Sequence, residues 1–61
     1  METRWMQSRT TEDLRDLALS YVLEREYATA YQIADFIRTW RTQGDVATEI
    51  EESAYCHQND C

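Results

Sequence analysis

The sequence has almost none of the residues that interrupt helices. It contains no proline and a single glycine, Gly44. Proline removes a backbone donor and clashes with the preceding turn, and glycine costs about 1 kcal/mol in a helix interior. A chain with so few helix breakers favours helix throughout, and we predict an all-α fold class.

Lysine is absent as well. All six basic residues are arginine, against twelve Asp and Glu, and the net charge is −6. A net negative charge opposes non-specific binding to nucleic acids and to anionic membranes. We therefore expect neither as the partner, and the charge fits binding to a neutral or basic protein surface.

Long apolar runs are also missing. No segment approaches the roughly 18 consecutive apolar residues of a membrane-spanning helix. The first nine residues lack the apolar stretch of a secretory signal peptide. These absences predict a cytoplasmic protein, in which the two cysteines, Cys56 and Cys61, stay reduced.

The residues that are present indicate a folded domain. Apolar residues make up 43% of the chain, and two Trp, four Tyr and one Phe are available for a core, unlike in disordered chains. A domain of this length buries only about 60% of the surface that its unfolded chain exposes. Such marginal domains often depend on a partner, so we expect an oligomer or a complex.

The pattern divides the chain into an N-terminal arm (residues 1–9), a single helical domain (10–55) and a flexible C-terminal tail (56–61). In the arm, Trp5 is expected to pack on the core. In the alternative interpretation, Trp5 and Met6 anchor a partner, because aromatic residues and Met are enriched at interfaces.

The first predicted helix covers residues 11–26. Thr10 is its expected N-cap, and Glu12 and Asp13 in the first turn suit the positive end of the helix dipole. Apolar residues at helical spacing then form one stripe. These residues are Leu14, Leu17, Ala18, Tyr21 and Val22.

The second predicted helix covers residues 30–43. Thr29 and Gln32 match a capping box, and Gly44 is placed to end the helix. Its stripe consists of Ala30, Ile33, Ala34 and Ile37, followed by Trp40 or Arg41. The turn between the two helices, residues 27–29, is very short. Short connections force helices to be antiparallel neighbours, which predicts a helical hairpin.

A short third helix is predicted over residues 46–55, with Asp45 as its cap. Val46, Ile50 and Ala54 share one face of it and make a weak apolar stripe. The chain's acidity is concentrated here, after Gly44.

Potential zinc ligands gather at the end of the chain, in Cys56, His57 and Cys61. A structural zinc site needs four ligands at characteristic spacings, and no second pair is present. We favour a loose tail over a zinc site or a disulfide. A nucleophile–base pair needs a rigid setting, which a chain end rarely provides. We predict no catalytic residue, no cofactor and no metal.

Residues 29–37 resemble the second helix of helix-turn-helix and winged-helix regulators, in a small residue, an Ile-Ala pair and a later aliphatic residue. The resemblance covers nine residues, and it implies that the following helix reads DNA. That helix is acidic here, whereas contacts to DNA phosphates come mostly from Arg, Lys and neutral donors. A DNA-binding regulator with a degenerate helix-turn-helix is therefore the alternative function.

The leading hypothesis is a small acidic protein-binding or regulatory module that acts through helix–helix contacts. A phage or plasmid accessory protein is one setting for such a chain. The apolar faces look wider than one hairpin can bury, and large apolar patches mark interfaces. We predict a homodimeric helical bundle whose seam contains Leu14, Leu17, Tyr21, Ile33, Ile37 and Trp40. The predicted surface for another partner contains Trp5, Glu49, Glu51 and Glu52.

Overall fold

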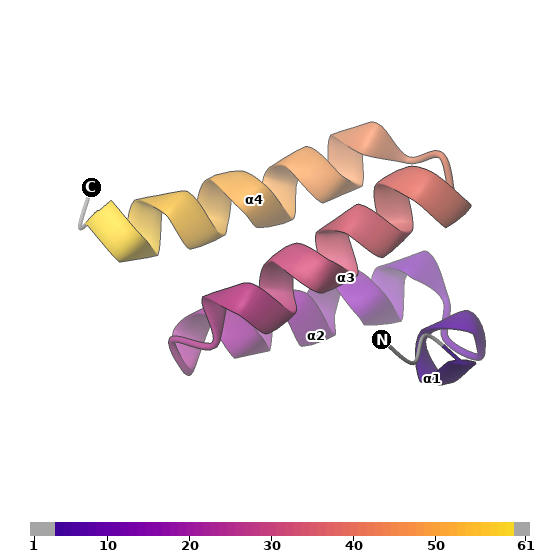
Figure 1. Ribbon diagram of the computed structural model, residues 1–61, viewed down its shortest axis with the longest axis horizontal. Coiled ribbons are helices and arrows are strands. Elements are labelled where there is room, and N and C mark those ends of the chain that lie inside the picture. Colours follow the sequence, from indigo (N-terminus) through magenta and orange to yellow (C-terminus); the bar gives the residue numbers. More distant parts are fainter. Residues whose placement is uncertain (1–3, 60–61) are drawn as a thin grey trace.

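The computed structural model describes residues 4–59, and every regular element in that range is a helix. The elements are α1 (Arg4–Gln7), α2 (Thr11–Leu23), α3 (Tyr27–Trp40) and α4 (Gly44–Asn59). The three long helices lie side by side along the long axis of the molecule, and α1 is a single turn at one end (Figure 1). The predicted all-α fold class is confirmed.

Contacts between the helices give their directions. Arg38 in the last turn of α3 contacts Glu51 near the middle of α4, and Tyr31 near the start of α3 contacts Gln58 near the end of α4. These two helices are therefore antiparallel. In Figure 1 the chain runs from right to left in α2, from left to right in α3 and from right to left again in α4, and α4 packs against both other helices. The architecture is a three-helix bundle, in which the predicted hairpin is two of the three helices.

The start of α2 is as predicted, because the Thr10 Oγ1 accepts a hydrogen bond from the Asp13 N–H at 3.1 Å. Its end comes earlier, at Leu23 instead of residue 26. Arg25 adopts a positive φ of 65°, which turns the chain out of the helix. The Arg25 N–H donates a hydrogen bond to the carbonyl oxygen of Val22 at 3.0 Å, and the Glu26 N–H donates to that of Tyr21 at 2.8 Å. This pair of bonds is a Schellman motif.

The start of α3 was predicted three residues too late. The helix begins at Tyr27, and its N-cap Glu26 makes no side-chain capping bond. Thr29 therefore lies inside the helix, and the predicted capping box is wrong. The predicted end at Gly44 is wrong as well, because α3 ends at Trp40 and Gly44 opens α4.

The last helix is longer than predicted. It has 16 residues, Gly44–Asn59, instead of the expected residues 46–55. Of the predicted tail, residues 56–59 are helical, and residues 60–61 lie outside the described part of the chain. Ala47 and Ala54 are fully buried on the inner face of this longer helix. Their small side chains let the backbone of α4 come close to its neighbours.

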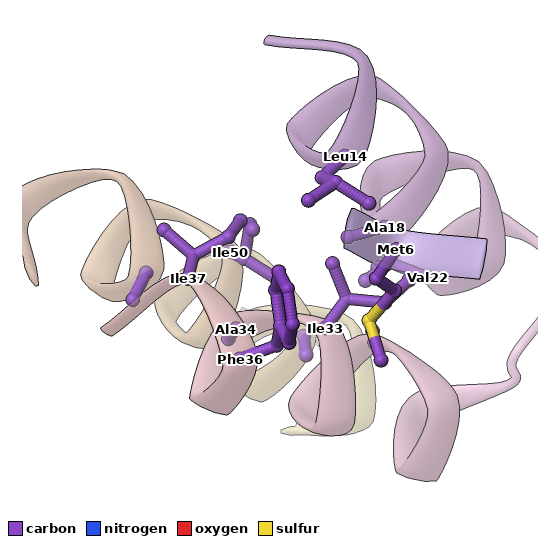
Figure 2. Packing of buried hydrophobic residues seen from close by; sticks show 12 residues of the cluster. Met6, Leu14, Ala18, Val22, Ile33, Ala34, Phe36, Ile37 and Ile50 are labelled. Atoms are coloured by element: carbon purple, nitrogen blue, oxygen red, sulfur yellow. The ribbon is translucent and has the colours of Figure 1, made fainter. Parts of the chain in front are cut away.

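The core is formed by apolar side chains from all four helices (Figure 2). Its members are Met6, Leu14, Ala18, Val22, Ala30, Ile33, Ala34, Phe36, Ile37, Ala47, Ile50 and Ala54. Trp5 is half-buried and packs against this core, as the first interpretation of the arm expected. Met6 is only 1% exposed, so α1 closes one end of the core.

Arg41 holds α1 in place. Its Nη2 donates to the carbonyl oxygens of Met6 at 3.3 Å, Gln7 at 3.4 Å and Arg9 at 2.7 Å. The guanidinium also lies over the ring of Phe36, 5.7 Å from the centroid. A planar group with several donors suits such a cluster of carbonyls, so one side chain joins the arm to the end of α3.

Candidate functional site

An open groove lies between α3 and α4 at the surface, with a volume of about 490 Å³. Tyr31 lines it from α3. The other lining residues come from α4, and they are Thr48, Glu51, Glu52, Tyr55 and Cys56. Most of the exposed lining is apolar. This hollow is within the size range of ligand pockets in proteins, and we treat it as the candidate site.

The groove follows from a second stripe on α4. Ala47, Ile50 and Ala54 point into the core, whereas Thr48 and Tyr55, one residue further along the helix from 47 and 54, point toward α3 and solvent. Residues three, four and seven apart share a helix face. The same helix therefore presents a small apolar stripe inward and a stripe with acidic and aromatic side chains to the groove.

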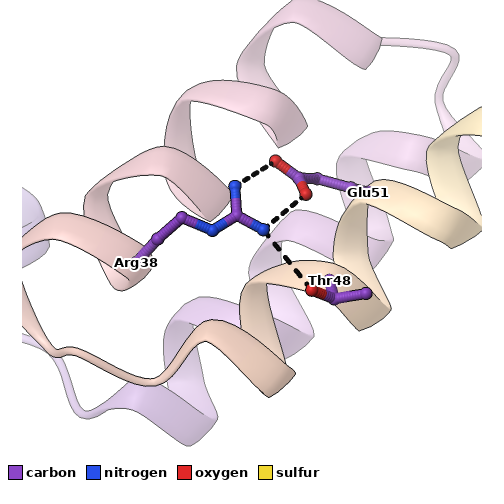
Figure 3. A network of polar contacts seen from close by, with 3 residues as sticks. All are labelled: Arg38, Thr48 and Glu51. Carbon is purple, nitrogen blue, oxygen red and sulfur yellow. Dashed lines mark hydrogen bonds and ion pairs between the residues drawn. The ribbon is translucent and has the colours of Figure 1, made fainter.

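A polar network fixes the wall of the groove (Figure 3). Arg38 donates from Nη1 and Nη2 to the two carboxylate oxygens of Glu51, at 2.8 and 2.7 Å, and from Nη2 to Thr48 Oγ1 at 3.4 Å. The hydrogen bonds from Arg38 lower the pKa of Glu51, and those to Glu51 raise the pKa of Arg38. This bidentate pair joins α3 to α4 and keeps Glu51 charged.

Two further polar groups of the groove differ in their partners. The Tyr31 hydroxyl donates to Gln58 Oε1 at 3.2 Å, which ties the far end of α4 to α3. The side chain of Glu52, in contrast, is exposed and makes no hydrogen bond or ion pair with any residue between 4 and 59. Glu51 is balanced by Arg38, so Glu52 is the acidic group of the lining whose charge no neighbour offsets.

Three of the six residues of the predicted dimer seam are not on the surface of the folded chain. Leu14, Ile33 and Ile37 are fully buried in the core of the single bundle, because α4 covers the hairpin that the sequence left open. These three side chains are not exposed to a second copy, which corrects their assignment to a seam. Leu17 and Tyr21 are half-buried against the core, and Trp40 is 64% exposed. The dimer itself stays a prediction.

The predicted partner surface is divided by the fold. Glu49 faces α2, where Arg15 Nε lies 3.7 Å from its carboxylate, whereas Glu51 faces α3. Residues two apart do not share a helix face. Trp5 belongs to α1, which lies at the opposite end of the molecule from the C-terminal end of α4 (Figure 1). Only Glu51 and Glu52 of the predicted set come together, and both line the groove.

Tyr31 and Tyr55 are the groove residues that sequence reasoning missed. Tyr55 is 62% exposed, and Tyr31 is half-buried on the opposite wall. The signal was present in the helical spacing of Thr48, Glu52 and Tyr55 on one helix. It becomes meaningful only when α4 is known to lie along α3, since one stripe alone does not make a groove.

The helix-turn-helix resemblance finds little support in this geometry. The helices of that motif cross at about 90–120°, whereas α3 and α4 lie antiparallel along each other (Figure 1). Of the potential zinc ligands, Cys56 is exposed, the His57 ring contacts Ser53 O at 3.1 Å, and Cys61 lies outside the described residues. Within residues 4–59, no three His, Cys, Asp or Glu side chains cluster as metal ligands would.

None of the helices between residues 4 and 59 combines the length and apolar character that crossing a membrane requires. Comparisons with models of known protein families, with curated proteins and with solved structures gave no match to this chain.

Proposed function

We propose that the protein is a small protein-binding module, and that it binds through the outer surface of its helices. The observation that carries this proposal is the groove between α3 and α4. It is open to solvent and mostly apolar, and the structure already holds its wall in place through the Arg38–Glu51 pair. A fixed, apolar hollow with a few polar groups is typical of a binding site.

Exposed aromatic and aliphatic side chains give the proposal further support. Leu23, Trp40 and Tyr55 are 72%, 64% and 62% exposed. Exposed apolar patches mark protein interfaces, and aromatic residues are enriched where proteins meet. These residues lie on α2, α3 and α4, so the bundle offers more than one face to a partner. The proposed setting is the cytoplasm.

The protein would have a regulatory role if it covers a surface of the partner on which the partner's own activity depends. Self-association is the second way in which these exposed side chains would be used, with Trp40 as the most exposed member of the predicted seam. DNA binding is the competing function, and a gel-shift series at low salt checks it. A shift with duplex DNA at micromolar protein would count against the module.

The proposal is tested by photo-crosslinking in living cells. A photoreactive residue is placed at position 23, 40 or 55, and at position 16 on the exposed face of α2 as the control. We expect a crosslinked product with one defined protein from at least one of the three apolar positions and none from position 16. The absence of any product from all three positions would refute binding through these surfaces.

A further inference from the structure

We propose that the α3/α4 groove binds a basic amphipathic helix of another protein, with apolar side chains seated between the tyrosines and an Arg or Lys beside Glu52. This inference rests on the proposed function and names the occupant of its site. Three features of the groove support it: its charge, its length and its aromatic walls.

Charge favours a basic occupant. Arg38 satisfies both carboxylate oxygens of Glu51, so a ligand gains little from that residue. Glu52 lies in the same lining with no ion pair to any described residue. The chain as a whole carries a charge of −6, which attracts a basic segment at long range and speeds encounter.

The same charge argues against a second copy in this groove. Two copies that meet face to face would bring Glu51 and Glu52 of one chain toward those of the other. Like charges across an interface are unfavourable, and they suppress wrong partners. The described α3/α4 face has Arg38 as its basic residue, and that guanidinium is already used within the chain.

The length of the groove suits a helix. Its α4 wall extends from Thr48 to Cys56, which is about 12 Å, or two helical turns. Its walls are two antiparallel helices, and a third helix laid between them would extend the bundle by known packing rules. Two turns accommodate apolar side chains at positions i, i+4 and i+7 of the ligand.

The aromatic walls add a reason for a cation at the edge. Tyr31 and Tyr55 lie on opposite sides of the groove, and Tyr55 is largely exposed. A guanidinium or ammonium group is attracted to the face of a tyrosine ring. An Arg or Lys that reaches Glu52 therefore lies close to an aromatic wall as well.

The probe is a synthetic helical peptide of about 14 residues, long enough to cover the groove. Leucines occupy one face and lysines flank it, and a matched peptide carries Glu in place of every Lys. Both are titrated into the full chain labelled with ¹⁵N. We expect the basic peptide to bind and to shift the amides of Tyr31, Glu52 and Tyr55, with little change at Leu23 or Trp40. Binding should weaken steeply between 0.05 and 0.5 M salt, because salt screens exposed charges.

Two exposed positions provide the variants. Glu52→Gln should weaken binding roughly threefold or more, the effect of losing one exposed ion pair. Tyr55→Ala should weaken it roughly tenfold, because it removes an aromatic wall. Glu24→Gln removes the same charge at the exposed end of α2, outside the groove, and should have little effect. Helicity measured by circular dichroism verifies that each variant is folded.

The inference is overturned if the acidic peptide binds as tightly as the basic one, if the shifts map outside the groove, or if Glu52→Gln and Glu24→Gln weaken binding equally. It is also overturned if no binding is detected at millimolar peptide. A crosslinked partner at position 55 combined with any of these results would leave the binding module in place and reject only the basic occupant.

Discussion

The conformation of the backbone at the end of α2 can be tested by one substitution. Arg25 has a φ of 65°, a region that glycine adopts freely and that costs other residues about 1–2 kcal/mol. Its side chain is exposed, and the backbone bonds to Val22 and Tyr21 already satisfy the helix end. Substituting Arg25 with glycine should therefore stabilise the protein without altering its core.

The magnitude follows from two opposing effects. Glycine at this position relieves the left-handed strain, but it also gives the unfolded chain more freedom, which offsets part of the gain. Alanine removes the same charge and the same side chain as glycine while it keeps the strain. The comparison of Arg25→Gly with Arg25→Ala therefore isolates the effect of backbone strain. We expect the free energy of unfolding of the glycine variant to be higher by about 1 kcal/mol.

The assay is thermal and urea unfolding followed by circular dichroism at 222 nm. For a domain of this size, 1 kcal/mol corresponds to a difference in Tm of about 4–8 °C. The wild type serves as reference for the lost charge, since a cation near a helix C-terminus is favourable. If Arg25→Gly is no more stable than Arg25→Ala, then the chain does not leave α2 through a left-handed residue, and the Schellman motif is refuted.

Three further predictions concern the arm, the wall of the groove and the oligomeric state. Arg41→Lys keeps the charge but loses the planar donors, so we expect faster amide hydrogen exchange in residues 4–9 and a loss of about 1–2 kcal/mol in unfolding free energy; unchanged exchange would contradict the role of Arg41. Glu51→Gln should lower the Tm at pH 7 and have no effect at pH 2: because Arg38 lowers the pKa of Glu51, the stabilisation is complete above the unfolded-state pKa and is lost as the pH falls through the folded-state value. A pH-independent difference in Tm would show that the charge of Glu51 is not the cause. Light scattering coupled to size exclusion should give twice the chain mass at high micromolar concentration if the predicted dimer forms, and a monomer mass would reject it.

Helical spacing was sufficient to predict most of the core. Leu14, Ala18 and Val22 recur at a helical period, as do the buried residues of α3, and a period of 3.6 identifies a buried face whatever the partner helix is. The N-cap Thr10 was predictable for a similar reason, because its capping bond is local. Met6 was not predictable, because the short arm has too few apolar residues to show a helical period.

The helix ends were harder to predict, and the reason lies in the backbone. Arg25 and Thr42 both adopt positive φ, yet neither residue type is typical of that conformation. Gly44, the one residue whose type signals a left-handed helix end, has an ordinary φ and begins α4 instead. Both helices therefore end beside residues whose type does not signal a helix end, and the glycine signal pointed to the wrong position.

The groove depends on the small side chains of the inner face of α4, and the apolar stripe of that helix alone does not reveal this. This helix packs through alanines and Ile50, so its inner face is narrow, and it lies close enough to α3 for Arg38 to reach both Thr48 and Glu51. A helix with larger inner residues would lie further out and would break that bidentate pair. The small buried side chains of α4 therefore contribute to the site, because they set the distance between α3 and α4. A larger residue in place of Ala47 or Ala54 should therefore alter the groove while the helix content of the protein stays unchanged.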